Sequence, residues 1–159
     1  MISRELYMTR IRPFMNKSII KVIVGMRRTG KSVMLQLIQK ELMESGVSAE
    51  QILSLNFESE KNSHLKTADA LYAFIDEKIN NAHGKVYIML DEVQEVDNWQ
   101  KTVNSLMVDF DSDIYITGSN ANLLSGELST YLAGRYVEIV VFPFSYSELI
   151  DLHKESGQD

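Results

Sequence analysis

The segment Gly25-Met-Arg-Arg-Thr-Gly-Lys-Ser32 constrains the fold of this chain more than any other. It fits the pattern G-x-x-x-x-G-K-[ST], in which the backbone N–H groups of a glycine-rich loop surround phosphate groups. A β-like apolar run over 18–24 precedes it, and a helix-like run over 31–44 follows it. An ordinary glycine turn requires neither neighbour, whereas a strand and a helix N-terminus hold a phosphate-binding loop in one shape. The pattern therefore predicts a P-loop that binds a nucleoside triphosphate together with Mg²⁺.

Each part of the predicted loop has a chemical role. Gly25 and Gly30 permit close approach of the backbone to the phosphates, and Lys31 adds a positive charge near the β- and γ-phosphates. The Ser32 hydroxyl is the expected ligand of Mg²⁺. For Arg27 and Arg28 two interpretations stay open: they face the phosphates or a neighbouring subunit, or they pair with surface carboxylates. The expected nucleotide-binding residues are Gly25, Met26, Arg27, Arg28, Thr29, Gly30, Lys31, Ser32 and Val33.

A second motif, Val86-Tyr-Ile-Met-Leu-Asp-Glu92, is an apolar strand that ends in two acidic residues. On its own it is compatible with a buried strand and an acidic turn. Together with the P-loop it predicts a Walker B strand, because ligands of an open parallel sheet bind at the carboxyl ends of the strands. Asp91 is then expected to hold Mg²⁺ through water, and Glu92 to act as general base toward the attacking water. This glutamate favours hydrolysis over the chemistry of a small-molecule kinase or a GTPase.

A third motif is a strand with a small polar tip, Ile114-Tyr-Ile-Thr-Gly-Ser-Asn120. If this strand lies between the first and the third, its tip is beside the γ-phosphate. Thr117, Ser119 or Asn120 is then expected to contact the γ-phosphate or the attacking water. The alternative is that Ser119 or Asn120 caps a following helix.

Two single residues have open interpretations. Arg135 follows Gly134 just before the last predicted strand, where an arginine can reach the nucleotide of a neighbouring subunit as an arginine finger. The alternative is that this Gly-Arg pair caps the carbonyls at a helix end. Asn56 is placed where a polar side chain can hold Glu92 inactive, although an asparagine at the end of a strand more often forms a turn.

Apolar periodicity predicts strands that alternate with helices along the whole chain. Thr67 and Asp97 are the expected caps of two of the helices, and 58–66 is expected to be a polar loop. Such alternation implies an α/β fold with a mostly parallel sheet covered by helices on both faces. The predicted strands are 18–24, 51–57, 85–91, 113–117 and 136–142, and the predicted helices are 31–44, 67–81, 97–108, 120–133 and one that begins at Ser145.

Composition excludes several classes of protein. The chain of 159 residues has no cysteine, which rules out disulfides and cysteine-based metal sites. Its net charge of -6 argues against nucleic-acid binding by the domain as a whole, although a local basic face stays open. No apolar run is long enough to span a membrane, and the N-terminus lacks the apolar core of a signal peptide. We therefore expect one cytoplasmic domain.

These motifs, in this order and together with the segment Leu132–Leu149, resemble the prokaryotic ATPases of the AAA+ superfamily, specifically the archaeal-type branch. The resemblance covers about residues 18–150. It implies a three-layer P-loop NTPase with a five-stranded parallel sheet in the order 5-1-4-3-2, and ATP as the ligand. It assigns Thr117–Asn120 to the sensor 1 position and Arg135 to the arginine finger. It also places Ile11, Pro13 and Phe14 beside the adenine.

The resemblance divides the chain into an N-terminal segment flanking the adenine site (1–17), an ATPase core (18–152) and a tail (153–159). AAA+ proteins typically carry a helical lid after the core, and related proteins continue into further C-terminal domains. We therefore expect this chain to be an N-terminal fragment.

Three functions follow from these expectations. The first is an ATP-binding domain that hydrolyses ATP with Mg²⁺ and so drives a conformational change in a larger protein, with a homo-oligomer formed through Arg135. The second is a nucleotide-operated switch or interaction module with negligible turnover. The third is a nucleic-acid-associated ATPase, which the net charge does not support.

Overall fold

A single parallel sheet forms the centre of the protein. The computed structural model describes residues 5–25, 30–80, 82, 84–119, 132 and 134–142. Its 5-stranded sheet has the order β2-β3-β4-β1-β5, and every neighbouring pair is parallel. This is the predicted order read from the opposite edge, so the predicted fold class is confirmed. The strands are β1 (Ile20–Gly25), β2 (Ile52–Asn56), β3 (Val86–Asp91), β4 (Ser112–Gly118) and β5 (Tyr136–Val141).

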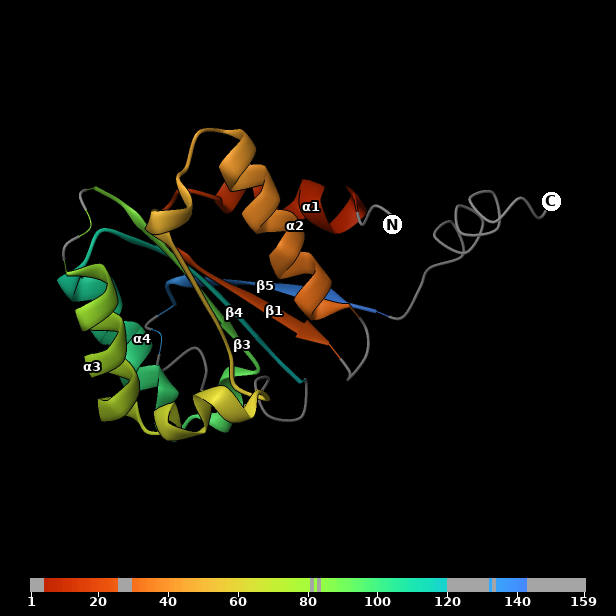
Figure 1. Cartoon of the computed structure of the whole chain (residues 1–159). Coiled ribbons are helices and arrows are strands. Elements are labelled where there is room, and N and C mark those ends of the chain that lie inside the picture. The colour runs from red at the N-terminus through yellow and green to blue at the C-terminus, as the bar shows by residue number, and fades with distance from the viewer. Residues whose placement is uncertain are drawn as a thin grey trace.

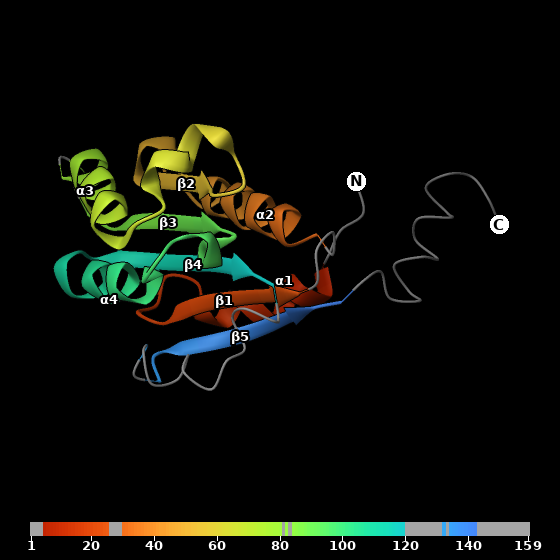
Figure 2. The same ribbon diagram turned by 90° about the horizontal axis from the view of Figure 1, so that it is seen from below.

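Helices cover both faces of this sheet and make three layers (Figures 1 and 2). On one face α1 (Glu5–Ile11) and α2 (Lys31–Glu44) pack on a core that includes Ile23, Met89 and Tyr115. On the other face α3 (Ala68–Ile79) and α4 (Trp99–Asp109) pack on a second core. The short 3-10 helices are η1 (Arg12–Phe14), η2 (Ala49–Gln51), η3 (Glu60–Leu65) and η4 (Val93–Glu95).

The apolar runs in the sequence correspond to the central strands. Every residue of β1, β3 and β4 is buried, as expected for parallel strands that have helices on both faces. Successive side chains alternate between the two cores, so that Val22 and Val24 face α3 and α4, while Ile23 faces α1 and α2. The edge strands β2 and β5 are partly exposed.

Most predicted elements agree with the structure within a few residues, and α2 has the predicted bounds. Thr67 caps α3 as predicted, because its hydroxyl accepts the N–H of Ala70. The predicted cap of α4 is wrong: Asn98 occupies the cap position in a left-handed conformation, with no side-chain cap bond. Asp97 instead forms a β-bridge with Thr67. The predicted helix from Ser145 lies outside the described residues, as does the predicted helix over 120–133 except for Leu132.

The helix α1 and the four described 3-10 helices were not predicted, and α1 and η3 are the longest of these elements. The helix α1 lies in the N-terminal segment, for which the apolar pattern predicts no element. The 3-10 helix η3 lies inside the predicted polar loop 58–66. Both were missed because neither has enough turns to produce a clear apolar period.

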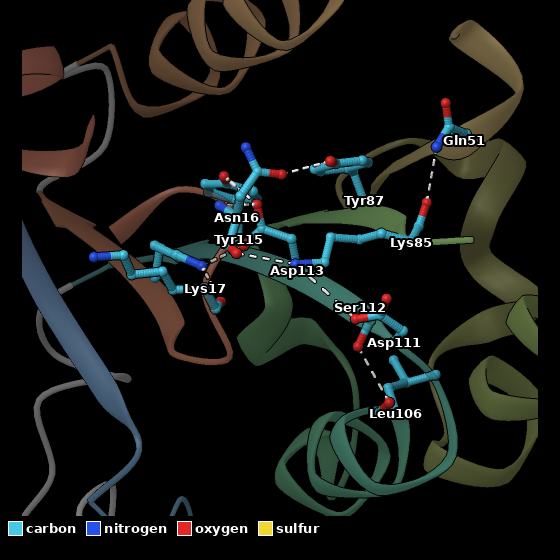
Figure 3. A network of polar contacts seen from close by, with 11 residues as sticks. Asn16, Lys17, Gln51, Lys85, Tyr87, Leu106, Asp111, Ser112, Asp113 and Tyr115 are labelled. Atoms are coloured by element: carbon cyan, nitrogen blue, oxygen red, sulfur yellow. Dashed lines mark hydrogen bonds and ion pairs between the residues drawn. The ribbon is translucent and has the colours of Figure 1, made fainter. Parts of the chain in front are cut away.

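A buried polar network lies at the amino ends of the strands, at the opposite end of β1 from Gly25 (Figure 3). Lys21 of β1 and Asp113 of β4 form an ion pair in which neither side chain is exposed to solvent. The Asp113 carboxylate also accepts the Tyr115 hydroxyl at 2.6 Å and the backbone N–H of Asn16 at 2.9 Å. The Tyr87 hydroxyl in turn donates to the Asn16 side chain. The network therefore attaches the segment before β1 to three strands.

Candidate functional site

The carboxyl ends of β1, β3 and β4 bring the predicted chemical residues to one edge of the sheet. β1 ends at Gly25, and α2 begins at Lys31 directly after Gly30. Gly30 has a φ of 91°, a left-handed conformation that favours glycine. The strand order places β4 between β1 and β3. This is the position in which the polar tip of β4 was expected to lie beside the γ-phosphate. Of the predicted loop, Met26, Arg27, Arg28 and Thr29 lie outside the described residues.

Lys31 is buried at the N-terminus of α2 and points to the end of β3. Its side chain is only 4% exposed. The ammonium donates to the carbonyl oxygen of Gly25 at 2.8 Å and lies 3.3 Å from the Glu92 carboxylate. A buried lysine held by a carbonyl and a carboxylate has a fixed direction, so its charge is available at one place in the site.

Ser32 and Asp91 form a pair of oxygen ligands. The Ser32 hydroxyl donates to the Asp91 carboxylate at 2.6 Å, and Asp91 itself is buried. Mg²⁺ prefers hard oxygen ligands and is usually held by one or two protein groups together with substrate phosphates and water. The donor set therefore fits Mg²⁺. Within the part of the chain that the structure describes, no group of three or more His, Cys, Asp or Glu residues is arranged to hold a metal ion alone.

Thr117 holds the end of β3 in place. Its side chain is fully buried. The hydroxyl accepts the backbone N–H of Glu92 at 2.9 Å and donates to the Asp91 carboxylate. Both hydrogen bonds of this hydroxyl go to the two acidic residues, so Thr117 positions them. Ser119 follows the end of β4, and Asn120 lies outside the described residues.

Glu92 has an unusual backbone and two side-chain partners. Its φ of 58° is rare for a residue with a Cβ and is common where function constrains the backbone. One carboxylate oxygen faces Lys31, and the other accepts the side-chain amide of Gln94. The Gln94 carbonyl oxygen is buried and has no hydrogen-bond partner among the described residues. Gln94 is thus a site residue that sequence reasoning missed.

Lys31, Ser32 and Glu92 line one cavity of about 760 Å³. It contains the predicted Gly30, Lys31, Ser32, Val33 and Glu92. The other lining residues were not predicted, because they lie in connections whose sequence has no periodic pattern. The lining residues are Gly30, Lys31, Ser32, Val33, Phe57, Glu58, Lys66, Glu92 and Glu95.

The Asn56 side chain forms a turn. No contact between the described residues joins it to Glu92. Its side-chain oxygen accepts the N–H of Glu58 at 2.9 Å, which is the turn-forming interpretation of this residue. Phe57, directly after it, donates its N–H to the carbonyl oxygen of Asp91 at 3.0 Å. The end of β2 is therefore tied to the end of β3 through the backbone.

The structure does not bring the expected adenine-flanking residues to this cavity. Ile11 is fully buried in the core beneath α2, and the Arg12 side chain next to it pairs with Glu41 near the end of α2. Lys31 and Glu41 are separated by about 15 Å along the helix axis. Pro13 and Phe14 follow at the same end, whereas the Tyr7 hydroxyl of α1 accepts the N–H of Phe142, just after β5, at 3.1 Å. The placement of Ile11, Pro13 and Phe14 beside the adenine stays a prediction.

Arg135 is also distant from the cavity of its own chain. It precedes β5, which runs parallel to β1, and the carbonyl oxygen of Arg135 accepts the N–H of Ile20 at 3.0 Å. Arg135 therefore lies at the amino ends of the strands, about 20 Å from the carboxyl edge. Its side chain is exposed, so it is open to contact with another molecule.

Residues 17–150 match the model of a family described as an AAA domain. The chain belongs to this AAA domain family. An AAA domain is an ATPase-type module that binds nucleotide, and among the described residues no helix has the length and apolar character needed to cross a membrane.

Two curated relatives are much longer than this chain. An uncharacterized protein of Haemophilus influenzae is 49% identical over 158 residues, which cover 99% of this chain and 40% of the relative. An uncharacterized protein of Methanocaldococcus jannaschii is 35% identical over 132 residues, which cover 82% of this chain and 28% of the relative. The chain thus spans less than half the length of these relatives.

A solved structure supports the fold of this AAA domain. The crystal structure of a DNA polymerase III, gamma subunit-related protein from Thermotoga maritima matches with a TM-score of 0.60 and 14% sequence identity. The match covers 96% of this chain and 50% of the other. At this identity the likeness concerns the fold alone.

Proposed function

We propose that this AAA domain binds ATP with Mg²⁺ in the cavity at the carboxyl edge of the sheet, hydrolyses it, and thereby drives a conformational change in a larger protein. The observation that supports this most is the convergence of Lys31, Ser32, Asp91 and Glu92. A lysine charge, a hydroxyl ligand for Mg²⁺ and a carboxylate base line one cavity, and the second ligand, Asp91, is hydrogen-bonded to Ser32. Phosphoryl transfer needs little more than such positioning and charge.

Each residue has a separate task in this proposal. The N-terminus of α2 and Lys31 bind the phosphates, since both provide positive charge. Ser32 and Asp91 hold Mg²⁺, which neutralises charge on the phosphates when it is bound. Glu92 accepts a proton from water as the water oxygen bonds to the γ-phosphorus and the bond to the β–γ bridging oxygen breaks. Thr117 keeps Asp91 and Glu92 in place.

Arg135 acts in a neighbouring copy of the chain in this proposal. Its exposure and its distance from the cavity of its own chain support a role toward the nucleotide of another copy. Hydrolysis is then expected to rise with protein concentration, and Arg135→Ala is expected to remove this rise.

A nucleotide-operated switch is the alternative, and the contacts of Glu92 favour it. The carboxylate is shared between Lys31 and Gln94. A base held by two protein groups must exchange one of them for water before it acts. Binding of ATP without turnover is the expected behaviour of such a switch.

Calorimetry with Mg²⁺ and ATP, followed by phosphate release in the same sample, tests the proposal. Lys31→Ala is expected to weaken ATP binding at least tenfold, on the order of a lost charge-assisted hydrogen bond. Lys40→Ala is the matched control, because Lys40 is an exposed lysine on the same helix. Glu92→Gln is expected to stop release while ATP still binds.

Each result has a definite meaning. If Lys31→Ala binds ATP as tightly as the wild type, the P-loop assignment is wrong. If release continues in Glu92→Gln, another group is the base. If the wild type binds ATP but releases no phosphate at any protein concentration, the switch is the better description.

A further inference from the structure

Lys66 is a lysine on the cavity wall with no assigned role. It lines the same cavity as Lys31, Ser32 and Glu92. Its side chain is half-buried. It lies between η3 and α3, so it belongs to neither the P-loop motif nor the predicted Walker B strand.

The backbone of Lys66 is firmly held. Its carbonyl oxygen accepts the N–H of Asp97 at 2.9 Å, and the next residue, Thr67, forms a β-bridge with Asp97. Leu65 and Ala68, which flank Lys66 and Thr67 in the sequence, are both buried. The side chain therefore starts from a fixed point beside the cavity.

The ammonium of Lys66 has no ion pair or hydrogen bond within the described ranges of the chain. Other lysines of the protein do have acidic partners: Lys21 pairs with Asp113, Lys31 with Glu92, and Lys101 with Asp69. Glu58 and Glu95 line the same cavity, but no ion pair joins either of them to Lys66. A half-buried charge beside a cavity and without a counter-ion is favourable for an anion that enters the cavity.

Lys31 and Lys66 adjoin helices that cover opposite faces of the sheet. Lys31 begins α2, which covers one face of the sheet, whereas Lys66 precedes α3, which covers the other face. In Figure 1 the segment of η3, drawn in yellow, lies beside the end of β3. Glu92 lies at that end and lines the same cavity, so the water attack proposed above takes place in the cavity that both lysines line. A phosphate that reaches this place is the terminal one.

We propose that Lys66 binds the γ-phosphate and so lets the protein distinguish ATP from ADP. This inference rests on the proposed function, since it concerns the same nucleotide. Lys31 is expected near the β-phosphate, which both nucleotides carry, as well as near the γ-phosphate, whereas Lys66 contacts only the γ-phosphate, which ADP lacks. The lysine ammonium is a point charge on a flexible stem, which suits a phosphate whose position changes during turnover.

Calorimetry with two nucleotides tests this role without relying on turnover. The probes are Mg²⁺ with ADP, and Mg²⁺ with the ATP analogue in which NH replaces the β–γ bridging oxygen. In Lys66→Met the stem stays and the charge is lost. We expect binding of the analogue to weaken about tenfold and binding of ADP to change less than about twofold. Lys66→Arg is expected to keep most of the preference.

The control is Lys101→Met, which removes a lysine that is 70% exposed and remote from the cavity. It is expected to leave both affinities unchanged. Near-ultraviolet circular dichroism of each variant checks that the fold is kept, and Lys66→Gln replaces Lys66→Met if the latter does not fold.

Three results overturn the inference. If Lys66→Met weakens both nucleotides equally, Lys66 acts on the shape of the cavity. If it weakens neither while Lys31→Ala weakens both, the proposed function stands and Lys66 is a solvated surface residue. If the wild type binds neither nucleotide, the proposed function and this inference both fail.

Discussion

At the scale of single residues, the Thr117 hydroxyl is the clearest case of a side chain that acts by holding others. Thr117 lies on the neighbouring strand β4, and its buried hydroxyl is hydrogen-bonded to both acidic residues at the end of β3. Thr117→Val keeps the shape but leaves the Glu92 N–H without its partner. We expect a loss of about 1–3 kcal/mol in the free energy of unfolding, measured by urea denaturation, and weaker Mg²⁺-dependent ATP binding.

Thr117→Ser is the matched variant, because it keeps the hydroxyl and removes one methyl group. It is expected to restore nucleotide binding, although the missing methyl still lowers stability. Equal binding by the valine and serine variants would show that the hydroxyl does not position Asp91 and Glu92.

The sequence allowed some of these residues to be predicted and not others. Lys31, Ser32, Asp91 and Glu92 were predictable because a loop pattern and an apolar strand fix their places at one sheet edge. The hydrogen-bond partners of Thr117 were not predictable. The sequence of a strand end indicates at which edge of the sheet a side chain lies, but not with which atoms it forms hydrogen bonds. Lys66 was missed because it lies in a crossover segment whose path depends on tertiary contacts.

At the scale of elements, the contact between α3 and α4 includes a hydrogen bond from the Tyr72 hydroxyl to the Asp109 carboxylate. This bond and the nearby negative charge raise the pKa of Tyr72 to about 12. A folded-state pKa above the ordinary value of 10.0 means that the bond stabilises the fold below pH 10. The contribution is then lost as the pH rises toward 12.

Tyr72→Phe is therefore expected to be less stable than the wild type at pH 8. The difference in unfolding midpoint should shrink between about pH 10 and 12. Thermal unfolding followed by circular dichroism at a series of pH values measures this. Tyr136→Phe is a control, since Tyr136 lies on β5, away from Asp109. A difference that stays constant across this range would contradict the role of the hydrogen bond.

The elements themselves were predictable to different degrees. The central strands were found because each is a continuous apolar run buried on both faces. The helix α1 was missed because its stability comes from Tyr7, Met8 and Ile11, which pack against α2 and β5. The predicted cap of α4 failed because Asp97 is used in the bridge to Thr67.

At the scale of the whole molecule, the Lys21–Asp113 ion pair joins β1, β4 and the segment before β1 in one buried network (Figure 3). Burial lowers the pKa of Lys21, and the Asp113 carboxylate opposes this effect. Asp113→Ala leaves a buried ammonium without a counter-ion. We expect this variant to lose about 3–5 kcal/mol in the free energy of unfolding, measured by urea denaturation.

The double variant Lys21→Met, Asp113→Leu is expected to regain much of this loss, because apolar side chains of similar size can replace a buried pair. Asp69→Ala is the control, since its ion pair with Lys101 is exposed and should matter little. If the single and double variants lose the same amount, the charge left in the core is not the cause.

The same pair restricts how this sequence can change over generations. A replacement of either charged residue alone passes through a protein with an isolated charge in its core, and selection removes such an intermediate. Two changes must therefore arise together, which is much rarer than either one. Between related proteins, we expect the two positions to differ jointly or to remain the same, even where the surrounding apolar residues drift freely.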